Sequence, residues 1–211
     1  MNRLVYRFGL WSAILALIFG LAYIIALFAT LLGFLTPPWD VAYQVAPSLP
    51  LASAFVVLMI SVHYYASSEL KIASHAAVIF ATVYAVLASM VYFTLLTVVI
   101  PNILAGQSDK VSLLLFNTGS FLTAVDGLAY GFMSLAALFA AVVFVGTGLV
   151  RWIRWALVAH GVLAPFIVGA VVLPVLLPIG ALWVITFPLT IVLLIALFRR
   201  LSAEEHAGIG R

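Results

Sequence analysis

The sequence contains no cysteine among its 211 residues. This absence excludes disulfide bonds, thiolate metal sites and cysteine nucleophiles. Charge is nearly as scarce, because Asp, Glu, Lys and Arg together make up only 7% of the chain, whereas soluble domains carry about a quarter. Hydrophobic residues make up 67%. A soluble fold of this size cannot hide so much apolar surface, so the composition indicates that lipid covers most of the exterior.

Motifs typical of catalysis and of nucleic-acid binding are missing as well. The chain shows no serine–histidine–aspartate constellation, no glycine-rich phosphate loop and no pair of carboxylates. The formal net charge is +3, but the nine Lys and Arg residues are scattered near the ends of apolar runs and form no patch. The sequence therefore predicts no nucleic-acid partner and offers no evident catalytic motif.

Long apolar runs account for most of the sequence. A hydrocarbon core of about 30 Å needs about 20 helical residues. The runs of suitable length are 8–35, 49–66, 73–100, 120–148, 153–173 and 179–198. They predict an all-α, polytopic membrane protein in which residues 1–211 form one transmembrane domain, a bundle of six helices. The proline-containing segment 36–48 and the longer segment 101–119 are then predicted to be loops on the outer side.

The positive charges orient this bundle. If the N-terminus is inside, only Lys110 lies outside. The cytoplasmic set is Arg3, Arg7, Lys71, Arg151, Arg154, Arg199, Arg200 and Arg211. Cytoplasmic loops of membrane proteins carry an excess of Lys and Arg, and an odd number of spans would destroy this asymmetry. The sequence thus predicts that both termini are cytoplasmic.

Asp126 is the clearest ionisable residue inside an apolar run. It lies about 8–10 Å below the outer end of the fourth run, at about 1.5 Å per residue. An ionised Asp at the bilayer centre costs on the order of 3 kcal/mol, and no basic residue occurs at a matching depth. Two interpretations stay open: a proton or cation site, or a neutral Asp that fixes helix packing through hydrogen bonds. Asp126, Tyr130 and His160 are the candidate residues for binding a ligand or an ion.

Small residues follow Asp126 along the same run. Gly127 and Gly131 form a GxxxG pattern, which lets helix backbones approach closely in lipid. Small side chains also recur every seven residues, at Gly127, Ser134, Ala141 and Gly148. The pattern favours a central, closely packed position for this helix in the bundle.

Three histidines fall in the cytoplasmic half of the predicted topology. His63, His75 and His160, together with Glu69, offer the donor types of a catalytic zinc site with an open position for water. Their spacing places no two of them on one helix face, and a bis-histidine haem would need two axial ligands at the same depth. No cofactor is therefore predicted, while zinc and haem stay as alternatives.

The turn between the fourth and fifth runs reads Arg151-Trp152-Ile153-Arg154-Trp155. Arginine and tryptophan are typical of the membrane interface, where they contact anionic headgroups and the interfacial belt. Arg151, Trp152, Arg154 and Trp155 are accordingly predicted to contact lipid headgroups.

Two stretches carry a resemblance to other proteins. One runs from His63 to Lys71 and leads into a helix with Tyr84 and Tyr92, and the other runs from Asp126 to Met133 and continues to the Arg–Trp turn. Together they resemble a group of small multi-pass prokaryotic membrane proteins of unknown function. The resemblance implies a prokaryotic inner (cytoplasmic) membrane and no particular chemistry. The chain differs from the seven-helix membrane hydrolases that bind zinc through three histidines, because it lacks a seventh span and a final helix with paired histidines.

Three functional hypotheses follow. The favoured one is a non-enzymatic membrane module, either an accessory subunit that binds another membrane protein or a second copy of itself, or a bundle that binds a small ligand or lipid. The second is a proton- or cation-coupled carrier centred on Asp126. The third is a metal-dependent membrane enzyme that uses His63, His75 and His160.

Overall fold

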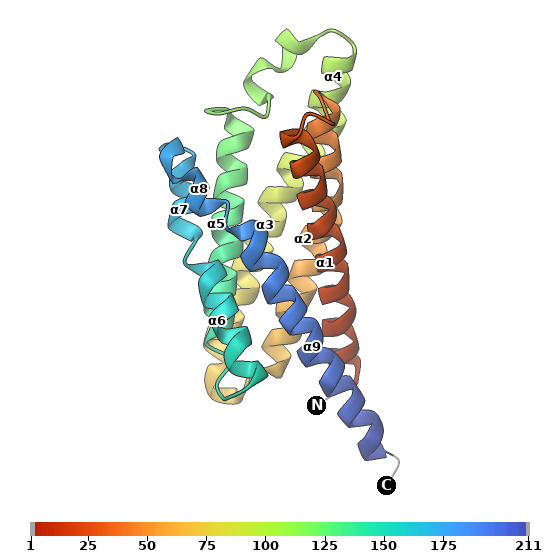
Figure 1. The fold of residues 1–211 in the computed structure, drawn as a ribbon, viewed down its shortest axis with the longest axis vertical. Coiled ribbons are helices and arrows are strands. Elements are labelled where there is room, and N and C mark those ends of the chain that lie inside the picture. The colour runs from red at the N-terminus through yellow and green to blue at the C-terminus, as the bar shows by residue number, and fades with distance from the viewer. Residues whose placement is uncertain (1–2, 210–211) are drawn as a thin grey trace.

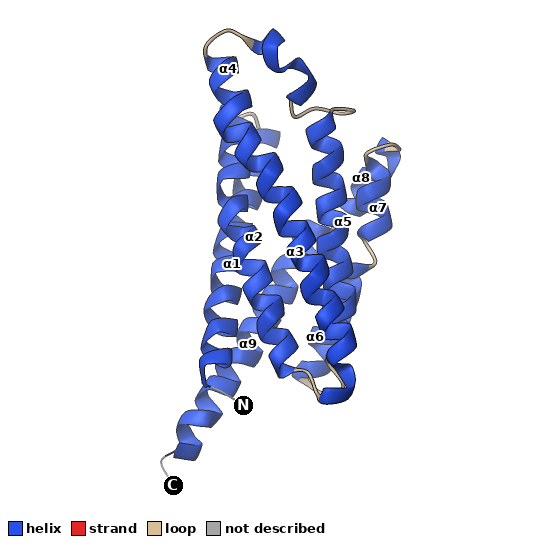
Figure 2. Cartoon of the chain, turned by 180° about the vertical axis from the view of Figure 1, so that it is seen from behind, coloured by secondary structure: helices blue, strands red, loops and turns tan. Residues whose placement is uncertain are grey.

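The computed structural model describes residues 3–209, and the side chains of residues 4–204, as helices joined by short turns, with no strand in that range (Figures 1 and 2). The elements are α1 (Arg3–Leu31), α2 (Trp39–Tyr65), η1 (Ser68–Leu70), α3 (Lys71–Thr94), η2 (Leu95–Val99), α4 (Ile100–Leu104), η3 (Ser108–Leu114), α5 (Phe121–Ala141), α6 (Leu149–Gly161), α7 (Ala164–Ala170), η4 (Pro174–Leu176), α8 (Leu177–Gly180) and α9 (Trp183–Ile209).

Six helical segments are long and apolar enough to cross a membrane. They are Leu4–Leu31, Trp39–Tyr65, Ser68–Leu104, Phe121–Ala141, Leu149–Ala170 and Pro174–Glu204. The predicted all-helical class is therefore confirmed for the described residues, and the six apolar segments suggest a multi-pass membrane protein.

The long helices form a closed ring that follows the chain. Each of α1, α2, α3, α5 and α6 packs against the next member of this series, and α9 packs against both α6 and α1. The start of α1 and the end of α9 lie at the same end of the bundle, which we call the terminal end (Figure 1). The opposite end carries α4 and η3, and we call it the loop end. Figure 2 shows the two ends from behind.

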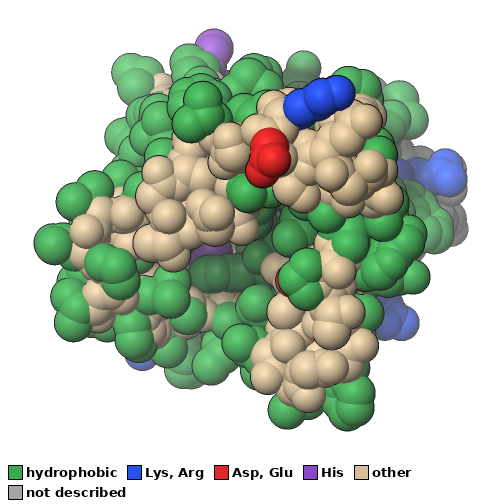
Figure 3. Space-filling view, turned by 90° about the horizontal axis from the view of Figure 1, so that it is seen from above, with side chains coloured by type: hydrophobic (Ala, Val, Ile, Leu, Met, Phe, Trp, Pro, Cys, Tyr) green, Lys and Arg blue, Asp and Glu red, His purple; other side chains and the backbone are tan. Residues whose placement is uncertain are grey.

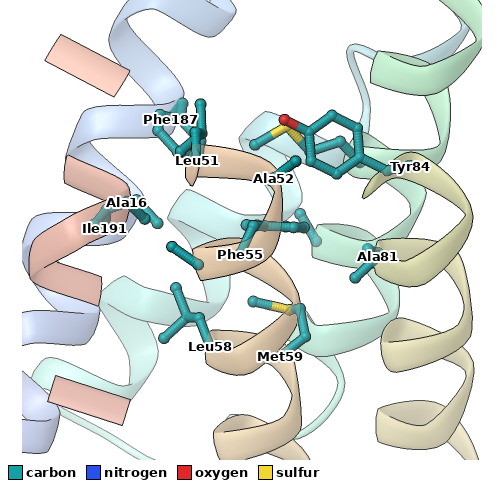
Figure 4. Close-up of a cluster of buried hydrophobic side chains, with 14 of the residues drawn as sticks. Ala16, Leu51, Ala52, Phe55, Leu58, Met59, Ala81, Tyr84, Phe187 and Ile191 are labelled. Carbon is teal, nitrogen blue, oxygen red and sulfur yellow. The ribbon is translucent and has the colours of Figure 1, made fainter. Parts of the chain in front are cut away.

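Aromatic side chains fill the centre of the ring. The ring of Phe55 on α2 lies 5.7 Å from Tyr84 on α3, edge to face, and 6.5 Å from Phe187 on α9. Fully buried alanines, such as Ala16 and Ala81, let the neighbouring backbones approach this cluster (Figure 4). One group of rings thereby holds two consecutive helices, α2 and α3, to the distant helix α9, and each ring buries about 150–250 Å².

The outside of the ring is apolar along most of its length. More than half of the side-chain surface of Phe8, Ile25, Ile72, Phe93 and Ile185 is exposed. Water would make such a surface strongly unfavourable at about 25 cal/mol per Å². The surface suits a hydrocarbon solvent instead.

The second helix begins ten residues earlier than the apolar run at 49–66 predicts, since α2 starts at Trp39. Pro47 and Pro50 lie inside it rather than in a stiff loop, so the prediction of a loop over 36–48 is wrong beyond Pro38. Proline keeps a helical φ, but inside a helix it removes one amide donor and crowds the carbonyl four residues earlier, here those of Tyr43 and Ala46. The Ser48 hydroxyl donates to the neighbouring Gln44 carbonyl at 2.9 Å. Packing along α1 maintains the rest of the helix.

The last three runs are interrupted where the sequence predicts continuous helices. The fourth helix ends at Ala141 instead of residue 148. Gly146 and Gly148 adopt φ of 149° and 62° and belong to the turn before α6, so the predicted run could not have stayed helical to its end. The fifth run breaks between α6 and α7, just before Pro165. The sixth begins as the short segments η4 and α8 before α9 starts at Trp183.

The glycines of the GxxxG pattern pack within the chain. A Cβ at Gly127 would meet Val171, and a Cβ at Gly131 would meet Val168, so this face of α5 lies against α7 and the turn that follows it. Gly148 does not continue the small-residue stripe, since it precedes α6 in the turn. The closest backbone approach is elsewhere, at Gly161 of α6, where a Cβ would lie 2.9 Å from the Cα and the backbone nitrogen of Leu138.

We expect Gly161→Ala to lower the stability of the bundle. The added methyl meets backbone atoms that cannot move aside, and overpacking of this kind costs about 1–3 kcal/mol. Gly169→Ala is the matched control, because its methyl would meet only the flexible end of Leu176, at 2.7 Å. Thermal unfolding in detergent should therefore show a lower midpoint for Gly161→Ala alone. Equal midpoints for both variants would contradict the close contact of α6 with α5.

Candidate functional site

The interruption of the last two spans opens a cavity in the loop-end half of the ring. The chain turns back between α7 and α8, and α9 starts well below the loop end (Figure 1). In this half of the bundle α9 does not fill the space between α1 and α5, so the ring of helices is open there. A cavity of about 240 Å³ lies there. Seen from the loop end, the molecule is hollowed between mainly hydrophobic side chains (Figure 3).

Aromatic rings from three helices form the floor and one side of this cavity. Tyr23 of α1, Tyr130 of α5 and Trp183 of α9 all line it. The Trp183 ring centroid lies 5.3 Å from that of Tyr23 at an interplanar angle of 60°, and 5.7 Å from that of Tyr130 at 34°. The rings are inclined to one another and do not form a flat stack. The opposite side is aliphatic and comes from α7 and α8, through residues such as Ile167 and Leu177.

Asp126 is the acidic residue in this cavity. Its Oδ1 atom is buried and makes no hydrogen bond to any described residue. The Tyr92 hydroxyl interacts with the carboxyl group and also donates to the Tyr130 hydroxyl at 3.0 Å. On its other side Asp126 borders a void of about 10 Å³ that Gln44 and Tyr92 also line, close to the space that one water requires.

No described basic side chain pairs with Asp126. Among the described side chains, the ion pair of the chain joins Arg200 and Glu204, which are exposed at the terminal end. A carboxylate in apolar surroundings is costly unless it is neutralised or paired. The cavity therefore presents a carboxyl group with spare acceptor capacity to whatever enters it.

His160 lies apart from this cavity. It is only 3% exposed, on α6, and its Nδ1 lies 3.0 Å from the Thr186 hydroxyl of α9, while its Nε2 is buried without a partner among the described residues. Its ring is 5.9 Å from that of Phe187. Of the three candidate ligand-binding residues, the structure brings Asp126 and Tyr130 together, whereas His160 joins the α6–α9 contact.

The candidate metal ligands are divided between two places. His63 and His75 face each other across α2 and α3 with ring centroids 5.6 Å apart, and His63 Nδ1 lies 2.9 Å from the Ser74 hydroxyl. Lys71 donates to the His63 carbonyl beside them. His160 is in the α6–α9 contact, and Glu69 is exposed in η1. No group of three such donors capable of holding a metal occurs within the described residues.

The predicted turn at Arg151–Trp155 is wrong, because these residues lie inside α6 at the terminal end. Arg151, Trp152, Arg154 and Trp155 are exposed, whereas Ile153 between them is fully buried. This arrangement is suited to headgroup contact, since the polar and aromatic groups point away from the bundle.

Sequence reasoning did not identify Tyr23, Tyr92 and Trp183 as site residues. Tyr23 sits in an otherwise uniform apolar run and carries no local signal. Trp183 does carry one, because it follows Pro174, Pro178 and Gly180 inside a long apolar segment. Proline and glycine interruptions of apolar runs indicate broken helices, which in membrane proteins line cavities.

We expect Thr186→Val to destabilise the protein more than Thr190→Val. The first change removes the partner of His160 Nδ1 and leaves a second buried ring nitrogen unsatisfied, at a cost of about 1–3 kcal/mol. Thr190 is a matched control because it lies one turn further along the same helix, and its hydroxyl bonds only to the Thr186 carbonyl. Thermal unfolding midpoints measure the difference, and equal midpoints would show that the His160–Thr186 contact contributes nothing.

Comparison of this chain with protein-family models, curated proteins and solved structures finds no match. The site is therefore interpreted from its own residues.

Proposed function

We propose that this chain is a multi-pass protein of the cytoplasmic (inner) membrane, with both termini inside, that binds a small ligand in the cavity at Asp126. The observation that carries the proposal is a buried carboxyl oxygen without a hydrogen-bond partner in a cavity whose wall consists of aromatic rings. Concave, mostly apolar cavities with a few convergent polar groups are the usual form of small-molecule sites.

Charge placement supports the orientation. Arg7, Lys71 and the basic residues of α6 and α9 all belong to segments at the terminal end, whereas Lys110 is in η3 at the loop end. The side chains of Arg3 and Arg211 lie outside the described ones. Under the positive-inside rule, the terminal end faces the cytoplasm and the Asp126 cavity faces outward.

The absence of cysteine makes this topology directly measurable. Ser112→Cys in η3 and Ser68→Cys in η1 each introduce a single thiol, and both positions are exposed. In intact cells, a membrane-impermeant maleimide should label the Ser112→Cys variant and leave the Ser68→Cys variant unlabelled until the membrane is opened. Labelling of Ser68→Cys alone would reverse the orientation, and equal labelling of both would contradict the span between them.

Binding without covalent chemistry fits the groups that the cavity gathers. Asp126 is surrounded by ring hydroxyls and aliphatic side chains, and the histidines lie elsewhere. A carboxyl group with aromatic walls can orient and hold a ligand. The same features suit a module that presents its ligand to another membrane protein.

A second candidate is a carrier that is coupled to a proton or another cation. The observation in its favour is the hairpin of α7 and α8, which lines the cavity beside Asp126. Transporters place their sites at discontinuous helices near the middle of the membrane. The helices are interrupted only in the last two apolar segments. Carriers built from an inverted repeat have helix breaks at matching positions in both halves of the chain, so this carrier would not be of that type.

We expect Asp126→Asn to abolish retention of the ligand while the fold stays intact. The amide has almost the same shape but no charge, so only the electrostatic contribution is lost. Native mass spectrometry of protein released gently from its own membrane should find a bound species on the wild type that is missing from this variant. Asp109→Asn is the matched control, because Asp109 is exposed at the same end and outside the cavity.

Both variants should elute as the wild type does in size-exclusion chromatography, which separates loss of ligand from loss of folding. The proposal fails if the wild type carries no small molecule or if Asp126→Asn retains the same one. For the carrier, the corresponding readout is flux into proteoliposomes, which Asp126→Asn should stop.

A further inference from the structure

We infer that the ligand of this cavity is a small organic monocation, an alkylated ammonium compound held between the Asp126 carboxylate and the rings of Tyr23, Tyr130 and Trp183. The inference rests on the proposed function, and it names the chemical class that the cavity would bind. Three independent features of the site lead to it: its uncompensated charge, its aromatic wall and its shortage of oxygen ligands.

The first feature is the charge. Asp126 forms no ion pair with a described residue, and the basic side chains of the described chain belong to segments at the two ends of the bundle. An ionised carboxylate with no counter-charge in such surroundings costs several kcal/mol. A cationic ligand supplies the missing charge, so binding and ionisation of Asp126 favour each other.

The second feature is the aromatic wall. Cations are attracted to the faces of aromatic rings within about 6 Å of the centroid, and Trp is the strongest of these partners. Trp183 lies between Tyr23 and Tyr130 with centroid distances of 5.3 Å and 5.7 Å. Rings inclined to one another and grouped beside one carboxylate are the arrangement by which proteins hold quaternary ammonium groups.

The third feature separates an organic cation from a metal ion. Calcium requires about six to eight oxygen ligands, and magnesium requires an octahedron of them. Beyond Asp126, the side chains that line the cavity offer only the hydroxyls of Tyr23, Tyr130, Thr118 and Thr123. Two of these four already accept hydrogen bonds, Tyr130 from Tyr92 at 3.0 Å and Thr123 from Ser120 at 2.9 Å. The remaining wall is aromatic or aliphatic, which suits the alkyl groups of an ammonium ion.

The volume sets the size of the ligand. The cavity measures about 240 Å³, slightly below the range of about 300–1,000 Å³ that is common for drug-sized ligands. Thr118 and Gly119, in the turn that precedes α5, belong to its lining and connect it to the loop end. A compact headgroup with a short substituent, entering from that end, fits these dimensions.

The test compares choline with its neutral carbon isostere, 3,3-dimethylbutan-1-ol, by calorimetric titration of the full-length protein in lipid nanodiscs. The two probes differ in charge but hardly in shape. We expect choline to bind the wild type at least about 10-fold more tightly than the isostere, since one ion pair and one cation–π contact together exceed the free energy of a tenfold change.

Substitutions of cavity residues test whether choline binds at Asp126 and Trp183. Asp126→Asn and Trp183→Leu should each weaken choline binding by at least about 10-fold, while Trp183→Phe, which keeps a ring, should lose less. The matched controls are Asp109→Asn and Trp39→Leu, which change exposed residues outside the cavity and should bind choline as the wild type does.

Equal binding of choline and the isostere would overturn the inference that the ligand is a cation. The proposal that the cavity binds a small ligand would still hold. Unchanged choline binding by Asp126→Asn would overturn the inference as well, because the cation would then be held elsewhere. If neither probe binds, the ammonium class is wrong. In that case the species retained in native mass spectrometry decides the proposed function separately.

Discussion

Backbone polar groups in an apolar solvent must find their partners inside the protein, and the last two spans meet this constraint although they are interrupted. At the break between α6 and α7, the Leu163 amide donates to the His160 carbonyl at 3.2 Å. At the hairpin, the Leu173 amide donates to the Gly169 carbonyl at 2.7 Å, and the Ala181 amide donates to the Leu177 carbonyl at 2.8 Å. Local turns thus satisfy the donors that a continuous helix would have used. The cavity depends on these turn hydrogen bonds, because without them α7 and α8 could not turn away from the ring of helices.

Close packing of α6 and α7 against α5 borders the opening. Gly127 and Gly131 receive Val171 and Val168 of the α7 segment, and Gly161 brings α6 into backbone contact with α5. Without a hydrophobic driving force between helices in lipid, such small residues allow the dispersion contacts that hold the bundle together. The hairpin is consequently fixed to α5 at the level of Asp126, so the same helix supplies both the support of the cavity wall and its carboxyl group.

A series of rings connects Asp126's neighbour Tyr130 with His160 across the inside of the bundle. The contacts run from Tyr130 to Tyr84, from Tyr84 to Phe55, from Phe55 to Phe187, and from Phe187 to His160. Aromatic contacts of this kind are stiff because each ring has few rotamers. They separate the open centre at Asp126 from the closed centre at His160, where the ring lies against Thr186. The two centres therefore have different roles: one borders a cavity, and the other holds α6 to α9.

The sequence by itself determined the helical class, the number of long apolar segments and the place of Asp126 inside an apolar helix, because hydropathy and residue type are properties of single positions and short windows. It also placed Arg151 and Trp152 on the surface. It did not determine that α2 begins at Trp39. The cost of Pro47 and Pro50 inside this helix is offset by packing against α1, and a short stretch of sequence around the prolines contains no information about that contact. Only the tertiary structure decided that Tyr23 and Trp183, from the first and last spans, meet beside Asp126, and that His160 lies away from His63 and His75. These outcomes depend on how the ring of helices closes and on how far along the bundle axis each residue lies. Contacts between segments that are distant in the chain, such as those of α9 with α1, determine the closure and these positions.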